Sequence, residues 1–262
     1  MDAALQHAIR RMTDEICRIL ADCVPAVYLY GSAAGDYRHG WSDIDLLVLT
    51  GRPMTDIQAG KLLMLRQTLQ DAEPETPFYR SFEGGMIDLE AFLNRTDSRA
   101  VYWGTSGQRI TAQYAMDCFS LRLLHEHGVL LYGPDVRSCL PCPDTDELLH
   151  GVQEHLRAIR IHGQGGRSLY TFGWMLDIAR GLYTAETGCV AAKTAAGEWA
   201  LNQGLCPEAQ ALRLALRVRQ DPSLKQDASV LARAEMFGPA IQAFADVLEE
   251  ALERRGLPLR FR

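Results

Sequence analysis

The chain has 262 residues, of which 47% are hydrophobic and 23% are charged, which is ordinary for one large or two modest globular domains. Its formal net charge is −6 and it has no block of Lys and Arg, so we expect no nucleic-acid partner, because such partners demand a basic face. No apolar run reaches the ~18 residues that a membrane span needs. The amphipathic start and the odd count of seven cysteines favour reduced thiols and a cytoplasmic location.

The first half of the chain mixes helical and strand-like patterns. Apolar residues recur at helical spacing near the start, and short apolar runs flanked by Gly or Pro follow. In chain order we expect a helix over 4–20, strands over 27–30 and 44–49, a helix over 55–70, a strand over 86–93, a helix over 117–127 and a strand over 129–132.

The second half reads as helix after helix. A segment with three prolines, 134–146, separates it from the first half and is the best domain boundary. The fold class is therefore an α/β domain with a small mixed sheet, residues 1–145, followed by an all-α helical domain, residues 146–262. The expected helices cover 148–161, 169–187, 193–201, 208–218 and 229–255, and Pro239 marks a break in the last of them.

The most informative stretch runs from Gly31 to Leu49 and reads GSAAGDYRHGWSDIDLLVL. Asp43 and Asp45 are two residues apart on a strand, so both carboxylates point to the same face. Like charges at that distance raise each other's pKa unless a cation lies between them, and Mg²⁺ prefers one or two carboxylates plus phosphate oxygens. Gly31 and Ser32 supply a turn whose backbone N–H groups and hydroxyl suit a phosphate. The alternative is an exposed strand start after an ordinary turn.

This pattern resembles the signature of the DNA polymerase β-type nucleotidyltransferase superfamily. The matching residues are Gly31-Ser32 and Ser42-Asp43-Ile44-Asp45-Leu46. The resemblance implies transfer of a nucleoside monophosphate to a hydroxyl, with ATP and Mg²⁺ as cofactors. Asp43 and Asp45 would then hold the metal, and Gly31 and Ser32 would hold phosphate.

The same resemblance implies a third carboxylate on a neighbouring strand. Ile87-Asp88-Leu89 fits the apolar-acidic-apolar pattern, so Asp88 is the first candidate for catalytic base or third metal ligand, and Glu90 is the reserve. Neighbouring carboxylates would push the pKa of such a base towards the working pH. The alternative is an edge strand with acidic residues facing water.

A closer resemblance covers the second half. Arg180, Tyr183, Thr187-Gly188 and Lys193 followed by an Ala-rich stretch to Trp199 are similar to the helical domain of aminoglycoside adenylyltransferases that modify spectinomycin and streptomycin. The resemblance implies that Arg180 and Lys193 bind the ATP phosphates, where cations suit the charge of the leaving pyrophosphate. The alternative for both is a solvated helix face. Around Tyr170 the residues depart from the drug-contacting pattern of that family.

We therefore expect an Mg²⁺-dependent adenylyltransferase that moves AMP from ATP to a hydroxyl of a small molecule, with an aminoglycoside-type antibiotic as the first candidate. Two alternatives stay open. One is an enzyme of the same fold that acts on a metabolite or a protein hydroxyl. The other is a nucleotide-binding sensor without catalysis.

Overall fold

The computed structural model of the protein describes residues 2–35, 37–104, 107–165 and 168–259. The chain forms two compact units, one made of residues 1–37 and 42–142 and the other of residues 38–41 and 143–262. The short segment 38–41 therefore packs with the second unit although the first surrounds it in the sequence. The division into a nucleotidyltransferase domain, residues 1–145, and a C-terminal helical domain, residues 146–262, stays a prediction.

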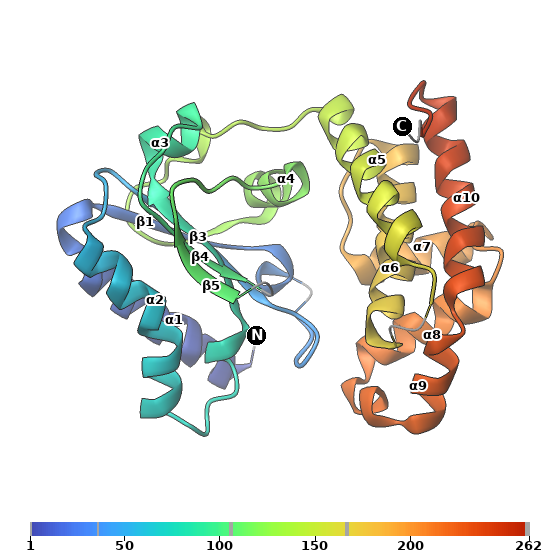
Figure 1. Ribbon diagram of the computed structural model, residues 1–262, viewed down its shortest axis with the longest axis horizontal. Helices are drawn as coiled ribbons and strands as arrows, with labels where there is room; N and C mark the ends of the chain where they lie inside the picture. The colour runs from blue at the N-terminus through green and yellow to red at the C-terminus, as the bar shows by residue number, and fades with distance from the viewer. Residues whose placement is uncertain (1, 36, 105–106, 166–167, 260–262) are drawn as a thin grey trace. The chain divides into compact units, whose positions relative to one another are not determined.

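A mixed sheet is the centre of the first unit (Figure 1). Among the described residues it has six strands in the order β5-β4-β3-β2-β1-β6. Strands β2 and β3 are parallel, and every other neighbouring pair is antiparallel. The strands are β1 Pro25–Tyr30, β2 Ile44–Thr50, β3 Phe82–Asp88, β4 Ala100–Gly104, β5 Gly107–Thr111 and β6 Val129–Tyr132.

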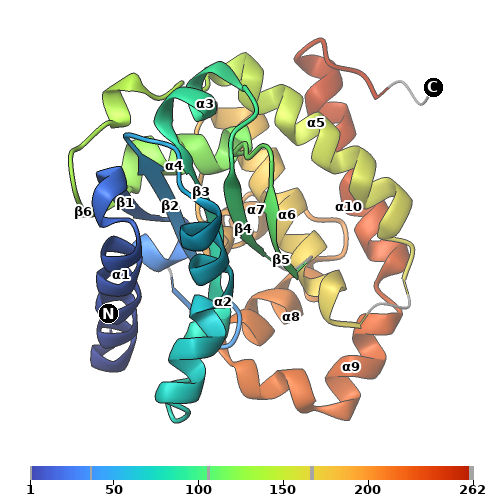
Figure 2. The same cartoon turned by 60° about the vertical axis from the view of Figure 1, so that its left-hand side comes forward.

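Helices cover both faces of this sheet (Figure 2). Successive side chains of a strand point to opposite faces, and the alternation divides the core in two. Val27 and Leu29 of β1 pack in one cluster with α1 (Ala3–Ile19) and α2 (Asp56–Ala72). Tyr28 and Tyr30 pack in the other with α3 (Leu89–Asn94) and α4 (Cys118–His127). Burial on both faces explains why β1 is apolar throughout.

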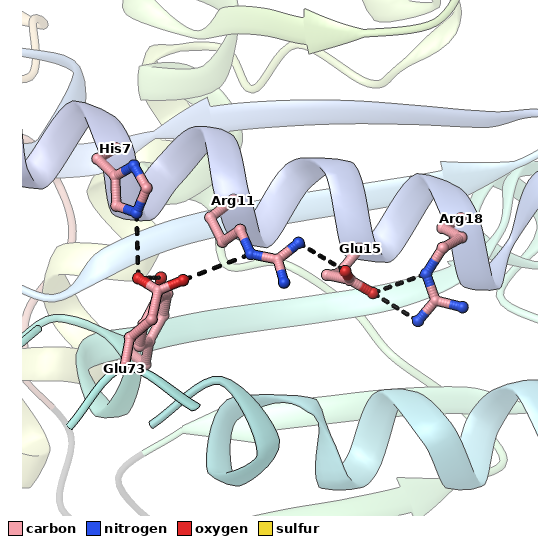
Figure 3. Close-up of polar contacts among 6 residues, drawn as sticks. His7, Arg11, Glu15, Arg18 and Glu73 are labelled. Atoms are coloured by element: carbon pink, nitrogen blue, oxygen red, sulfur yellow. Dashed lines mark hydrogen bonds and ion pairs between the residues drawn. The ribbon is translucent and has the colours of Figure 1, made fainter. Parts of the chain in front are cut away.

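A chain of polar contacts joins α1 to the end of α2 (Figure 3). His7 Nε2 lies 3.0 Å from Glu73 Oε2, and Arg11 links Glu73 to Glu15 through contacts of 3.5 Å and 2.7 Å. The buried Tyr79 hydroxyl donates to Glu73 at 2.7 Å. That hydrogen bond, followed by the one with His7, lowers the pKa of Glu73. Glu73 thereby fixes the turn immediately before β3.

The second unit is helical. Its long central helix, α6 (Ser168–Thr187), contacts each of the others. Small residues of α6 allow the neighbouring helices to approach closely. A Cβ built on Gly181, for example, would lie 3.0 Å from Val152 of α5. The surrounding helices are α5 Thr145–His162, α7 Lys193–Asn202, α8 Ala209–Gln220, α9 Ala228–Glu235 and α10 Gly238–Arg254. None of the helices in the described part of the chain has the length and hydropathy of a membrane span.

The structure confirms the fold class, a mixed sheet with helices followed by a helical domain. It differs from the predicted elements in two places. The strand expected over 86–93 begins and ends earlier, because Asp88 caps α3: its Oδ1 accepts a hydrogen bond from Ala91 N at 2.9 Å. Strands β4 and β5 were not expected; Trp103, in β4, is fully buried.

Candidate active site

Gly31 follows β1 and packs directly against Asp45. Its φ is +64°, a left-handed conformation that favours glycine. A Cβ built on Gly31 would lie only 2.2 Å from Asp45 Oδ2. The next residue, Ser32, donates a hydrogen bond from Oγ to the backbone oxygen of Asp43 at 3.4 Å. The Gly-Ser turn and the two aspartates therefore form one local structure, as the sequence predicts.

The two aspartates lie at the start of β2. Asp43 immediately precedes the strand and is exposed, whereas Asp45 is its second residue and is half-buried. In the sheet register Asp45 lies opposite Tyr30 of β1 and opposite Glu83 of β3. Asp45 shares the face of Leu47 and Leu49, which is the face that α4 covers.

Glu83 is a candidate site residue that the sequence patterns did not predict. Glu83 lies on the same face of the sheet as Asp45. It is four residues from Ile87 on β3, so the two side chains point the same way, and Ile87 packs in the cluster that contains α4. Burial raises the pKa of Glu83 to about 7, and the charge of Asp43 adds to the effect, whereas Arg66 opposes it. Arg66 is held nearby by hydrogen bonds to Phe82 O at 2.7 Å and to Gln108 Oε1 at 2.9 Å.

Two tyrosines extend this acidic region. Burial raises the pKa of Tyr30 and of Tyr114, and the charge of Asp45 raises both further. Tyr114 packs so closely on β3 that a Cβ on Gly85 would lie 2.3 Å from its ring. Phenol groups that stay protonated are hydrogen-bond donors, so both tyrosines keep that capacity beside Asp45.

The structure does not bring Asp88 or Glu90 to this site. Asp88 pairs with Thr50 at the far end of β2 and β3, five register positions beyond the pair of Asp45 and Glu83. Asp88 is buried. It lies two residues after Met86 on β3, so it points to the same face as Met86, which is the face opposite to that of Asp45. Glu90 is exposed in the first turn of α3. Asp88 and Glu90 therefore lie apart from Asp43 and Asp45, and Glu83 takes their place as the candidate third carboxylate.

A signal for Glu83 was present in the sequence. A strand, a helix and a second strand in succession favour parallel strands. The starts of parallel strands lie at the same edge of a sheet, so an acid that partners Asp45 belongs at the start of the next strand. Gly84-Gly85 interrupts the apolar pattern of β3, so the apolar run that predicts a strand starts only at Met86, three residues after Glu83.

The helical unit places Arg180 and Lys193 together. Arg180 is on α6 and Lys193 is the first residue of α7. Both contact one oxygen of Asp177: Lys193 Nζ lies 2.9 Å and Arg180 Nη2 3.3 Å from Oδ1. Burial works against the charged form of Asp177, yet the charge of Lys193 and the hydrogen bond with His155 outweigh it and hold the pKa of Asp177 well below its ordinary value.

A pocket of about 410 Å³ lies beside this cluster, within the second unit. Aromatic rings form much of its wall, and the rings of Tyr170 and Trp174 lie with their centroids 6.3 Å apart and their planes tilted by 31°. Trp41 lies in the wall as well and is anchored by a hydrogen bond from Nε1 to Val218 O at 2.7 Å. The pocket residues are Trp41, Leu169, Tyr170, Phe172, Gly173, Trp174, Leu176, Asp177, Lys193, Ala215 and Arg219.

The described residues include no group of three His, Cys, Asp or Glu side chains arranged to enclose a metal. Mg²⁺ does not require such a cage, since it commonly takes one or two carboxylates and completes its shell with phosphate and water. Asp43 raises the pKa of Glu83, and Asp45 raises those of Tyr30 and Tyr114. This concentration of negative potential suits a hard cation, so the donor set fits a magnesium ion shared with a phosphate ligand.

Comparisons with known proteins relate this chain to aminoglycoside adenylyltransferases. Residues 144–248 match the family described as aminoglycoside adenylyltransferase, C-terminal domain. Spectinomycin 9-adenylyltransferase from Staphylococcus aureus is 24% identical over 193 residues, which cover 70% of this chain and 73% of that protein. The crystal structure of spectinomycin adenyltransferase AAD(9) from Enterococcus faecialis with ATP and spectinomycin has the same fold, with a TM-score of 0.67 and 15% identity, covering 93% of this chain and 98% of that one. Residues 144–248 therefore resemble the C-terminal domain of the aminoglycoside adenylyltransferases, and the chain as a whole is aminoglycoside adenylyltransferase-like.

Proposed function

We propose that this protein transfers AMP from ATP to a hydroxyl group of an aminoglycoside-type antibiotic, with spectinomycin as the first candidate. The observation that carries the proposal is the meeting of Asp43, Asp45 and Glu83 at the start of two parallel strands, next to the Gly31-Ser32 turn. This arrangement offers two carboxylates for a metal, a third for a proton and a turn for phosphate.

Asp43 and Asp45 would hold Mg²⁺. The ion would neutralise charge on the phosphates of ATP and so stabilise the negative charge that develops during transfer. Gly31 contributes by leaving room for Asp45 Oδ2, which a larger residue would displace. Ser32 contributes a hydroxyl group, which lies beside the backbone oxygen of Asp43.

Glu83 is the proposed general base. A base works best when its pKa is near the working pH, and the pKa of Glu83 is raised to about 7 by burial and by Asp43. Glu83 takes the proton of the acceptor hydroxyl while the acceptor oxygen forms a bond to the α-phosphorus of ATP. The bond between the α-phosphorus and the bridging oxygen breaks, and pyrophosphate leaves with that electron pair.

Arg180 and Lys193 are the proposed triphosphate-binding residues of the helical unit. Both lie inside the segment that matches the adenylyltransferase C-terminal domain. Two cations whose nitrogens converge on a single carboxylate oxygen have the spacing that a phosphate oxygen also accepts. The leaving pyrophosphate carries growing negative charge, which fixed cations stabilise.

The proposed acceptor rests on the relatives and on the pocket. The relatives named above are spectinomycin adenylyltransferases. The pocket of the helical unit has the size of a small-molecule site, which commonly spans roughly 300–1,000 Å³, and its aromatic faces suit both sugar-like rings and ammonium groups.

The test is release of pyrophosphate from ATP and Mg²⁺ in the presence of spectinomycin, streptomycin, kanamycin or lincomycin, with Asp45→Asn as the blank. We expect release with spectinomycin or streptomycin and none in the blank. ATP binding without release with any drug would overturn the antibiotic acceptor and favour a metabolite or protein hydroxyl. ATP binding that is unchanged in Asp45→Asn, with no turnover of any acceptor, would favour a nucleotide sensor.

A further inference from the structure

Asp177 lies at the centre of a cluster that draws on three helices. Its Oδ1 contacts Lys193 Nζ of α7 at 2.9 Å and Arg180 Nη2 of α6 at 3.3 Å, while its Oδ2 lies 3.5 Å from His155 Nε2 of α5. The Asp177 side chain is only 11% exposed, compared with 30% for Lys193 and 23% for Arg180. The carboxylate is therefore the inner member of the cluster, and the two cations are its outer members.

The shared oxygen constrains both cations at once. Two like charges repel each other when they are brought together, so Arg180 and Lys193 need an anion between them to stay adjacent. Long basic side chains also lose rotamer freedom when they are fixed. An ammonium group has three donors and a guanidinium five, so a single shared carboxylate does not exhaust their capacity to bind an anion.

We propose that Asp177 is a positioning residue that holds Arg180 and Lys193 together as a preformed binding element for the triphosphate of ATP. The inference rests on the proposed function, since it assumes that these cations bind the triphosphate. Asp177 does not touch the nucleotide in this scheme. It acts by removing the cost of bringing two cations together at the moment of binding, which is the usual source of affinity in a preorganised site.

The placement of Asp177 favours this role over that of a simple surface ion pair. Lys193 and Asp177 both line the 410 Å³ pocket, so the cluster borders a space that a ligand can enter. Ion pairs at the surface contribute little. Asp246, the partner of Arg160, lies at the surface in this sense, because its side chain is 65% exposed. Asp246 therefore provides a matched control: an aspartate in a helical ion pair of the same unit, with no contact to Arg180 or Lys193 among the described residues.

The experiment measures the dissociation constants of ATP and of AMP, with Mg²⁺ and without acceptor, for the wild type, Asp177→Asn and Asp246→Asn. We expect Asp177→Asn to weaken ATP binding about tenfold and to change AMP binding by less than about twofold, because AMP lacks the β- and γ-phosphates. Asp246→Asn should bind both nucleotides as the wild type does. In turnover, Asp177→Asn should raise the KM for ATP much more than it lowers kcat.

A second set of variants separates positioning from folding. In a Lys193→Met background, Asp177→Asn should weaken ATP binding by less than about threefold, because a residue that acts through Lys193 loses its effect when Lys193 is gone. Asp177→Glu keeps the charge and should recover part of the affinity, and it replaces Asp177→Asn if that variant does not fold. ATP binding in Asp177→Asn as tight as in the wild type, or tighter, overturns the positioning role.

The two proposals fail in different ways. A wild type that binds no ATP would remove the proposed function itself. A wild type that binds ATP and loses affinity on Lys193→Met, but not on Asp177→Asn, would leave the function standing and remove the role of Asp177.

Discussion

Asp45 and Glu83 are register partners on the adjacent parallel strands β2 and β3. Their side chains lie on the same face of the sheet. Asp45 also pairs with Tyr30, the residue immediately before the Gly31-Ser32 turn. This relationship makes Glu83, at the start of β3, the proposed third carboxylate, whereas Asp88 lies at the other end of that strand.

The first prediction compares the two candidates for the base. Glu83→Gln should lower kcat by about 100-fold or more, the range expected when a general base is removed. Asp88→Asn should leave kcat within about twofold, because asparagine caps helices as well as aspartate does. Pyrophosphate release at saturating ATP and acceptor measures both. An inactive Asp88→Asn variant that melts like the wild type, beside an active Glu83→Gln, would contradict the assignment.

The second prediction concerns the contact of Gly31 with Asp45. Gly31→Ala places a Cβ 2.2 Å from Asp45 Oδ2 and forces alanine into a φ of +64°. We expect a loss of about 1 kcal/mol or more in the free energy of unfolding, and an activity loss from displacement of the Asp45 carboxylate. Chemical denaturation and pyrophosphate release measure the two effects.

The control for this variant is Gly35→Ala, since a Cβ at Gly35 meets nothing within 4 Å and the φ of Gly35 is not positive. Equal effects of the two substitutions would show that the Gly31–Asp45 contact has no special role.

The third prediction concerns the segment 38–41, which packs in the second unit. Trp41 donates from Nε1 to Val218 O at 2.7 Å, and Lys225 Nζ lies 3.5 Å from the centre of its ring. Trp41→Phe keeps an aromatic ring but removes the hydrogen bond, so it should lower the free energy of unfolding by about 1 kcal/mol. Trp41→Ala should cost more, because it also removes the ring. A Trp41→Phe variant as stable as the wild type would show that the bond is unimportant.

The fourth prediction concerns the pH dependence of stability. The pKa of Asp177 is held far below its ordinary value by Lys193, His155 and Arg180, in spite of its burial. A carboxylate with a depressed folded-state pKa contributes stability above its unfolded pKa, about 3.9, and this contribution is lost as the pH falls below that value. The difference in melting temperature between the wild type and Asp177→Asn should therefore be large at pH 7 and should shrink below about pH 4. A constant difference across that range would contradict this linkage.

Much of the architecture could be predicted from local patterns. Helical spacing of apolar residues placed α1, α2 and the helices of the second half to within a few residues, because each presents one apolar stripe to a core. The hairpin of β4 and β5 could not be predicted, since β5 is largely exposed and carries little apolar alternation. Only the tertiary structure reveals that Trp103 lies in a strand and is buried in the core.

The amino-acid sequence by itself predicted the residues that we propose to bind phosphate and metal. Gly31, Ser32, Asp43 and Asp45 lie within one short stretch, and neighbours along a turn and a strand remain neighbours in space. Glu83 and Asp177 required the tertiary structure. Glu83 reaches Asp45 only through the parallel register of β2 and β3, and Asp177 meets Lys193 and His155 only because three helices converge on it. Contacts between residues far apart in the chain depend on how the elements pack, and that packing is a property of the whole fold.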